Sequence, residues 1–305
     1  MRVEFTAGSD DHDRRLESVL RRLLPRQSLG ALHKALRTGD VRLNGARAAP
    51  EHHVHSGDTI AVWDALVTAE APRTPAPTAA TLPESWIVFT GPDLVVVSKP
   101  SGVLVHRGEG TRGGEPPLDE LVRRWLAPAS AASLSFRPGP LHRIDRETSG
   151  LVVFSRTLAG ARAFSAALAA RRVTKTYLTV LRGSLDGPRE AAEAIVRDPG
   201  TRTSAVGSGQ AAVTRFRPVA QAQGLTLAEV DLGTGRTHQI RVHAQSLGFP
   251  LAGDAKYGGG ATPAGLEVPW LLHAWRLSCD LLPPLTAPLE PRLAAWIKKE
   301  FKKTP

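Results

Sequence analysis

The chain has 305 residues, 42% hydrophobic and 22% charged, so it can form about two domains with substantial cores and is not a disordered protein. No apolar run approaches the roughly 18 residues of a membrane-spanning helix, and we expect no signal peptide and a cytoplasmic location. Cys279 is the only cysteine, which excludes an intrachain disulfide framework and a cysteine-based zinc site.

The charge balance is strongly basic, with 39 Lys and Arg against 29 Asp and Glu, a net charge of +10. Such an excess favours contact with a polyanion, either nucleic acid or an anionic membrane. A genome rich in G and C, which favours Arg and Ala, is the alternative explanation. The position of the charges along the chain distinguishes between the two.

Two helices and a hairpin turn are predicted near the N-terminus. The apolar residues of 16–23 have helical spacing, and Pro25 ends this helix. A second helix over 29–36 begins after Ser28, a suitable N-cap, and Asn44-Gly45 is a strong hairpin signal. Short strands are expected at 41–43 and 59–63.

Most of the excess charge lies in residues 14–47, which contain nine basic and two acidic residues. A solvated helix face usually mixes both signs, so a segment of one sign indicates a phosphate-binding surface. The basic residues are Arg14, Arg15, Arg21, Arg22, Arg26, Lys34, Arg37, Arg42 and Arg47.

The chain divides into three expected zones: a small module over 1–64, a linker over 65–84 and a larger domain over 85–305. The linker is rich in Pro and Ala and has no periodic apolar face, which is typical of a semi-extended connection. Strand-like and helical runs alternate after it, so the larger domain contains both helices and strands, but this pattern alone does not fix the type of sheet.

The densest polar cluster is the segment 142–150, which directly precedes an apolar strand-like run. Asp145 lies there between Arg143 and Arg146, and a carboxylate beside a basic cleft can act as a nucleophile or general base. A structural ion pair in a loop is the alternative. Lys99 ends an earlier buried strand and can reach into the same cleft, although such a lysine is more often structural.

Two further segments carry candidate residues. Tyr177 follows a basic run, and an aromatic ring beside cations suits base stacking, although a strand tyrosine is more often part of the core. The segment 233–244 is a glycine-rich turn that enters a helix, and a helix N-terminus beside Arg236 is an anion-binding feature.

Residues 14–64 resemble the small RNA-binding module named after ribosomal protein S four. The matching pieces are Arg15-Leu16, the Lys34–Arg37 run, the Gly39–Gly45 hairpin segment and Gly57-Asp58. The resemblance implies that this module docks structured RNA by shape and backbone, and it points to Arg15, Lys34, Arg37 and Arg42 as RNA contacts.

Residues 85–280 resemble the RluA-type pseudouridine synthases. The motifs occur in that family's order: Lys99-Pro-Ser-Gly102, the segment 142–150, Lys175-Thr-Tyr177, the segment 235–243, Gly253-Asp254 with Tyr257-Gly258, and Leu272-His-Ala274. The resemblance implies an α+β fold, in which the small helix-hairpin module precedes a larger mixed, mainly antiparallel sheet flanked by helices. It also implies an isomerase that converts uridine in RNA to pseudouridine without a metal or cofactor. The segment after Leu277 departs from the family pattern.

Roles follow from this resemblance residue by residue. Asp145 is expected to be the nucleophile, Tyr177 to stack on the target base and help remove its carbon 5 proton, and Arg236 to pair with Asp145. Substrate contacts are expected from Arg143, Lys99, His142 and Arg241.

The expected partner is structured RNA, with large-subunit ribosomal RNA ahead of transfer RNA; we expect a monomer and no membrane. A non-catalytic RNA-binding protein on a synthase scaffold is one alternative. A nucleosidase or glycosidase is another, but such enzymes usually need a second placed acid, and no partner for Asp145 is evident.

Overall fold

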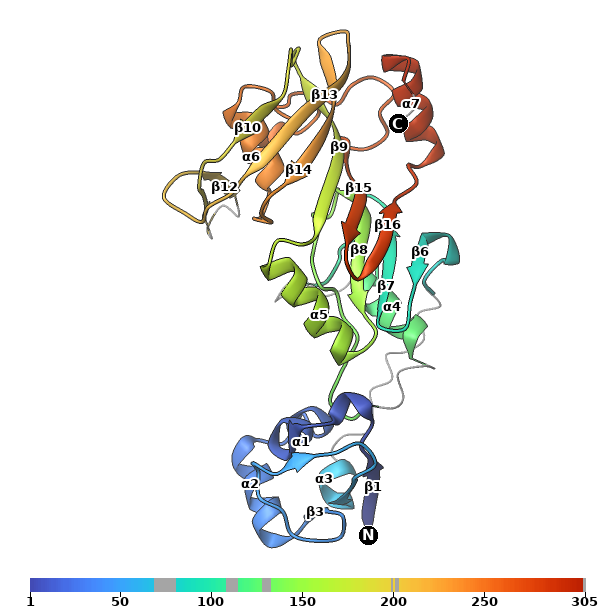
Figure 1. Ribbon diagram of the computed structural model, residues 1–305, viewed down its shortest axis with the longest axis vertical. Helices are drawn as coiled ribbons and strands as arrows, with labels where there is room; N and C mark the ends of the chain where they lie inside the picture. Colours follow the sequence, from blue (N-terminus) through green and yellow to red (C-terminus); the bar gives the residue numbers. More distant parts are fainter. Residues whose placement is uncertain (69–80, 108–114, 128–132, 199, 201–202, 304–305) are drawn as a thin grey trace.

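The computed structural model describes residues 1–68, 81–107, 115–127, 133–198, 200 and 203–303. The molecule is elongated, with the N-terminal elements gathered at one end and a large sheet occupying the rest (Figure 1). Within these ranges, no helix is long and apolar enough to cross a membrane.

The N-terminal elements form a small unit of helices packed on a short sheet. The three-stranded sheet has the order β1-β5-β3, and a two-stranded pair joins β2 and β4. The elements are β1 (Arg2–Thr6), β2 (Arg14–Arg15), α1 (Leu16–Leu23), α2 (Leu29–Thr38), β3 (Val41–Leu43), β4 (His53–Val54), β5 (Thr59–Trp63) and α3 (Asp64–Thr68).

The two predicted helices are confirmed, and their limits have local causes. The Ser28 hydroxyl caps α2 by accepting a hydrogen bond from the Ala31 amide at 3.2 Å, and Gly39 ends the helix with a φ of 81°. The buried leucines of both helices, among them Leu16 and Leu32, meet in one core. The helical spacing therefore marked the face that packs inward.

The predicted turn at Asn44-Gly45 is also present, but its strands pair differently from a simple hairpin. Asn44 and Gly45 have φ angles of 50° and 78°, and Leu43 and Ala46 exchange backbone hydrogen bonds of 3.0 and 2.9 Å. Beyond this turn β3 pairs with β5. Strand β1 was not expected from the sequence, and it adds to the other edge of β5.

The expected linker is only partly described. Residues 65–68 belong to α3, whereas 69–80 lie outside the described residues. Leu82 is buried in the core of the large sheet, and a 3-10 helix (Glu84–Trp86) follows. The chain is thus already packed against the second unit near the end of the proline-rich stretch.

In the described part of the second unit, nine strands form one mainly antiparallel sheet, which confirms the predicted α+β fold. Its order is β10-β13-β14-β9-β15-β8-β7-β6, with β16 paired to β15, and only β15 and β8 run parallel. The strands are β6 (Ile87–Thr90), β7 (Leu94–Lys99), β8 (Ser149–Ser155), β9 (Thr174–Arg182), β10 (Arg189–Ala191), β13 (Thr214–Ala222), β14 (Leu225–Leu232), β15 (Leu272–Cys279) and β16 (Leu282–Thr286). A separate hairpin joins β11 (Ile195–Asp198) to β12 (Thr203–Val206).

Helices cover both faces of this sheet because alternate strand residues point to opposite sides. On one face, α4 (Leu118–Leu126) and α6 (Gln239–Ser246) pack against a core that includes Val97 and Tyr177. On the other, α5 (Leu158–Ala169) covers the strands around Val96, and α7 (Pro291–Phe301) covers those around Val180.

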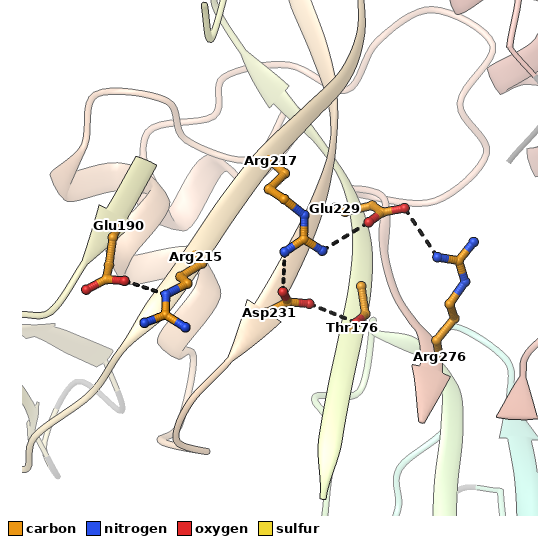
Figure 2. Close-up of polar contacts among 7 residues, drawn as sticks. All are labelled: Thr176, Glu190, Arg215, Arg217, Glu229, Asp231 and Arg276. Atoms are coloured by element: carbon orange, nitrogen blue, oxygen red, sulfur yellow. Dashed lines mark hydrogen bonds and ion pairs between the residues drawn. The ribbon is translucent and has the colours of Figure 1, made fainter. Parts of the chain in front are cut away.

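Beyond α7, the second face carries exposed ion pairs between neighbouring strands (Figure 2). Arg217 contacts Glu229 at 3.1 Å and also pairs with Asp231, while Arg276 contacts the opposite oxygen of Glu229 at 3.4 Å. Exposed pairs of this kind stabilise a protein by only about 0–1 kcal/mol each. They keep an uncovered sheet face polar rather than holding it together.

The N-terminal unit is joined to the large unit through Asp11, which lies in a 3-10 helix (Ser9–Asp11) and is fully buried. Its carboxylate accepts hydrogen bonds from the backbone amides of Leu134 at 2.8 Å and Ser135 at 2.9 Å, and from the Ser133 hydroxyl at 3.1 Å. Burial raises the pKa of Asp11, but these hydrogen bonds outweigh it and lower the pKa below its ordinary value.

We expect Asp11→Ala to lower the free energy of unfolding by about 3 kcal/mol, because several buried donors lose a charged acceptor. In the wild type the stabilisation should be complete above the unfolded pKa of about 4 and disappear as the pH falls through the lowered folded value. Urea unfolding measures both effects. The control is Asp186→Ala, at an exposed position, whose free energy of unfolding should stay within about 0.5 kcal/mol of wild type. If Asp11→Ala is as stable as this control, Asp11 does not hold the two units together.

Candidate active site

A cavity of about 230 Å³ opens between the N-terminus of α6, the strands β9 and β14, and the loop before β8. It brings together the motifs at 142–148, 175–177 and 235–241, which are far apart in the sequence. Its lining residues are His142, Arg143, Ile144, Asp145, Thr148, Lys175, Tyr177, Leu232, Gly235, Arg236, Thr237, His238, Gln239, Ile240, Arg241 and Leu272.

Asp145 lies in the loop that leads into β8, with its side chain 21% exposed toward the cavity. The loop turns sharply there, because the Thr148 amide donates to the Asp145 carbonyl at 3.2 Å. The chain then enters the buried strand β8 at Ser149. A carboxylate is thus presented to the cavity from the end of a rigid core strand.

Lys99 lies beneath this loop rather than in the cavity wall, so the geometry differs from the expected substrate contact. It is 1% exposed, and its ammonium group donates to the carbonyls of Pro100, Val103 and Arg146 at 2.9, 2.7 and 2.7 Å. Burial lowers the pKa of Lys99 to about 7, while Glu147 and Asp145 oppose the shift. Three carbonyl acceptors require the protonated amine, and together they fix the loop that carries Asp145.

The cation nearest to Asp145 is Arg241, not Arg236 as the resemblance implied. The Nη1 atom of Arg241 lies 3.6 Å from Oδ2 of Asp145. The Arg236 side chain is exposed and donates from Nε to the Ala211 carbonyl at 3.2 Å. Helix geometry explains the difference: Arg241 lies within α6 on its buried side, whereas Arg236 precedes the helix in the turn.

Arg241 is itself held by a second carboxylate. Its Nε and Nη2 atoms donate to the two oxygens of the fully buried Asp254, at 2.6 and 2.8 Å. The rings of Tyr257 and Trp270 lie 4.7 and 4.4 Å from the guanidinium carbon. Burial alone lowers the pKa of Arg241, but Asp254 and Asp145 reverse this and raise it, so the cation is permanent.

His238 forms a second link to Asp145 that sequence reasoning missed. It precedes α6 with a φ of 57°, and its Nε2 atom lies 3.9 Å from Oδ2 of Asp145. Its Nδ1 atom is hydrogen-bonded to the Tyr257 hydroxyl at 2.7 Å, and that hydroxyl accepts from the Ser204 amide at 3.0 Å. Burial lowers the pKa of His238, which favours the neutral ring.

Tyr177 is 5% exposed and lines the cavity from β9, as the resemblance implied. Burial, followed by the nearby charge of Asp145, raises the pKa of its phenol. The side chain therefore stays neutral near neutral pH. Lys175, two residues earlier on the same strand face, also lines the cavity, and burial lowers the pKa of its amine.

Two buried polar atoms at the cavity have no hydrogen-bond partner among the described residues: the Thr148 hydroxyl and Nδ1 of His142. The Nε2 atom of His142 accepts from the Val153 amide at 3.1 Å, so in the neutral ring the hydrogen is on Nδ1. Burial lowers the pKa of His142 to about 3, which keeps the ring neutral. A buried polar atom without a protein partner beside a cavity indicates that its partner comes from outside the described chain.

The basic residues expected to contact RNA remain largely free of acidic partners. Arg15, Lys34 and Arg37 are exposed, while Arg42 is half-buried and donates to the Gly45 carbonyl at 3.3 Å. Arg37 and Arg47 also line a separate hollow beside α2. These positions are on the N-terminal unit, far along the chain from the cavity.

Comparisons with known proteins give the family. Residues 93–246, about half of the chain, match the family model described as RNA pseudouridylate synthase. The chain belongs to this family. It is therefore an RNA pseudouridine synthase, an isomerase, which supports the predicted activity over the non-catalytic and glycosidase alternatives.

Named relatives cover most of the chain. The ribosomal large subunit pseudouridine synthase D of Xylella fastidiosa is 36% identical over 251 residues, which is 81% of this chain and 72% of the relative. The ribosomal large subunit pseudouridine synthase C of Vibrio cholerae is 31% identical over 264 residues, 84% of this chain and 81% of the relative.

Solved structures show the same fold. Human RNA pseudouridylate synthase domain containing 4 aligns with a TM-score of 0.57 at 21% identity, covering 70% of this chain and 92% of that chain. Human RNA pseudouridylate synthase domain containing 1 aligns with a TM-score of 0.55 at 24% identity, covering 71% and 90%.

The two arginines should differ sharply when each is replaced by lysine. Lysine cannot form the two parallel hydrogen bonds to Asp254, so we expect Arg241→Lys to lower the free energy of unfolding by about 3 kcal/mol. It should also slow tritium release from RNA labelled at uridine carbon 5, because Asp145 loses its nearest cation. Arg236→Lys is the control and should change the free energy of unfolding by less than about 0.5 kcal/mol. A larger loss of stability in Arg236→Lys than in Arg241→Lys contradicts the role of Arg241 as the buried partner of Asp145 and Asp254.

Proposed function

We propose that the enzyme isomerises one or more uridines of large-subunit ribosomal RNA to pseudouridine in the cytoplasm. The observation that carries the proposal is the cavity in which Asp145, Arg241 and Tyr177 meet. The choice of RNA rests on the names of the relatives, several of which are ribosomal large subunit pseudouridine synthases. Transfer RNA is the alternative substrate, and we expect the enzyme to act as a monomer.

Asp145 is proposed as the nucleophile. Its carboxylate attacks the target nucleotide at the ribose or the uracil ring, and the bond between ribose C1′ and uracil N1 breaks with its electron pair left on the base. The uracil then turns, and C5 bonds to C1′ as the bond to Asp145 breaks and its carboxylate is regenerated. The proton on C5 then passes to this carboxylate or to water. Arg241, held by Asp254, keeps a fixed positive charge 3.6 Å from the carboxylate throughout.

The uracil edge is proposed to contact the two unpartnered atoms of the cavity. The Nδ1–H of His142 can donate to a uracil carbonyl, and the Thr148 hydroxyl can accept from N3–H or donate to the other carbonyl. A pocket built this way rejects bases with the opposite donor pattern, because its buried polar atoms would stay unpaired.

Tyr177 is assigned to stacking on the flipped base and not to proton removal. A phenol whose pKa burial raises is a poor base at neutral pH, which argues against the second role implied by the resemblance. Arg143, also on the cavity wall, is proposed to contact the RNA beside the flipped nucleotide. Flipping costs a few kcal/mol, and a stacking ring offsets part of that cost.

The N-terminal unit, 1–64, is proposed to dock structured RNA through Arg15, Lys34, Arg37 and Arg42, with 65–84 as its connection to the catalytic domain, 85–305. The segment 14–47 within it has nine basic and only two acidic residues, and this local excess supports a phosphate-binding surface. The contacts of Asp11 fix this surface relative to the domain that holds Asp145. Docking at one end would then place a particular uridine at the cavity.

Replacing the proposed nucleophile should abolish the reaction. We expect Asp145→Asn to release no tritium from large-subunit ribosomal RNA transcribed in vitro with uridine labelled at carbon 5, because an amide cannot form the covalent bond. Wild type and the control Asp186→Asn should both release it, and release should be weaker from transfer RNA transcripts. Release by Asp145→Asn rejects the nucleophile, and release from transfer RNA alone rejects the ribosomal substrate.

The docking role of the N-terminal unit predicts a change in salt dependence. Each lost phosphate contact should flatten the slope of log affinity against log salt by about 0.7–0.9. We therefore expect replacement of Arg15, Lys34, Arg37 and Arg42 by Gln to flatten the slope by about 3 in filter binding. The control variant carries four Gln replacements at Arg215, Arg217, Arg276 and Arg292. If the slope of log affinity against log salt is the same in both variants, the N-terminal unit is not the docking surface.

A further inference from the structure

A second cavity lies beside the active site, in a part of the chain to which the reaction assigns no role. It has a volume of about 410 Å³ and opens between the β11–β12 hairpin and the turn at 235–237. Its described lining residues are Ile195, Val196, Arg197, Ser204, Gly209, Gln210, Gly235, Arg236 and Thr237. The last three also line the first cavity, so one turn of chain separates the two.

The charge of the described lining of this second cavity is entirely positive. Arg197 and Arg236 contribute guanidinium groups, and none of the described lining residues is acidic. Arg197 lies in strand β11, between the exposed residues Val196 and Asp198. Its guanidinium forms no hydrogen bond or ion pair with another described residue. Two cations that line one cavity without an acidic residue beside them favour a bound anion.

Ser204 provides an independent indication of a ligand. The residue is 3% exposed, yet its hydroxyl has no hydrogen-bond partner within the described ranges. Buried hydroxyls are almost always paired, because an unpaired one loses its bonds to water. Ser204 is one of the residues that line the cavity, so a molecule bound there can supply the partner that its hydroxyl lacks.

Arginine side chains and a serine hydroxyl, in a cavity whose described lining has no carboxylate, are groups that bind phosphate oxygens in RNA-binding proteins. An RNA chain that places a uridine in the first cavity must continue past the turn at 235–237. We propose that the second cavity binds the phosphodiester group of the nucleotide next to the target uridine, held by Arg197, Arg236 and Ser204. This proposal rests on RNA being the substrate, as the proposed function states.

The hairpin is also connected to the reacting carboxylate. Ile195 packs in one small core with Val242 of α6 and Tyr257. The Ser204 amide donates to the Tyr257 hydroxyl at 3.0 Å, that hydroxyl bonds His238 at 2.7 Å, and His238 lies 3.9 Å from Asp145. A phosphate that fixes Ser204 therefore also fixes the neighbours of Asp145.

The test uses the full chain and unmodified large-subunit ribosomal RNA transcribed in vitro. Filter binding over a range of salt concentrations should show about tenfold weaker binding for Arg197→Ala and a slope flattened by about 0.7, since one phosphate contact is lost. Arg197→Lys should recover most of the slope. Ser204→Ala, which keeps the backbone bond to Tyr257, should weaken binding severalfold and leave the slope unchanged.

The matched control is Arg215→Ala. Arg215 is an exposed arginine of β13 that points to the opposite face of the sheet, where it pairs with Glu190 (Figure 2). It should bind RNA as wild type does. A slope for Arg197→Ala equal to that of Arg215→Ala overturns the phosphate site.

Tritium release under single turnover separates this proposal from the proposed function. At subsaturating RNA, Arg197→Ala should be about tenfold slower than wild type, and at saturating RNA within about twofold, because the lost contact affects binding. If Arg197→Ala releases tritium more slowly than wild type only at saturating RNA, the contact does not act in binding and the proposal is overturned. No release by wild type, with the binding difference between Arg197→Ala and Arg215→Ala intact, rejects ribosomal RNA as substrate and leaves the phosphate site standing.

Discussion

A guanidinium group buried in a protein interior needs fixed negative partners, and Arg241 has two of them. Asp254 is fully buried and holds it by two hydrogen bonds, while Asp145 is partly exposed and lies 3.6 Å away. The unequal burial separates their roles: the buried carboxylate fixes the cation, and the cation then fixes the carboxylate that faces the cavity. The loop of Asp145, the helix α6 and the loop of Tyr257 must all fold correctly before this arrangement exists.

The sequence was most informative where local chemistry decides local structure. The helices of the N-terminal unit followed from apolar spacing and from Ser28, and the turn at Asn44-Gly45 followed from the backbone freedom of those two residues. Strand β1 was missed although Val3 and Phe5 alternate with polar residues, because a run of five residues is short and its side chains stay mostly exposed. It exists because β5 offers a free edge, and that condition is visible only in three dimensions.

The site was predicted as a set of motifs, but not as a set of contacts. Arg236 and Arg241 are both basic and lie in one motif, so spacing alone could not show which one reaches Asp145. The structure decides it through the start of α6, which turns Arg241 inward and leaves Arg236 at the surface. His238 was missed for the same reason, because its left-handed backbone conformation, and hence its direction, depends on how the turn packs.

The same turn now connects recognition with chemistry. Residues 235–237 form the wall between the reactive cavity and the cationic cavity, and α6, which follows directly, carries Arg241. A base that has left its stack gives up stacking energy, which contacts elsewhere on the RNA must offset. Contacts with phosphates can supply that energy for any sequence, whereas the contacts proposed for His142 and Thr148 would distinguish uracil from other bases. In the proposed mechanism, binding strength and base selectivity are therefore separable, and each belongs to one of the two cavities that residues 235–237 line.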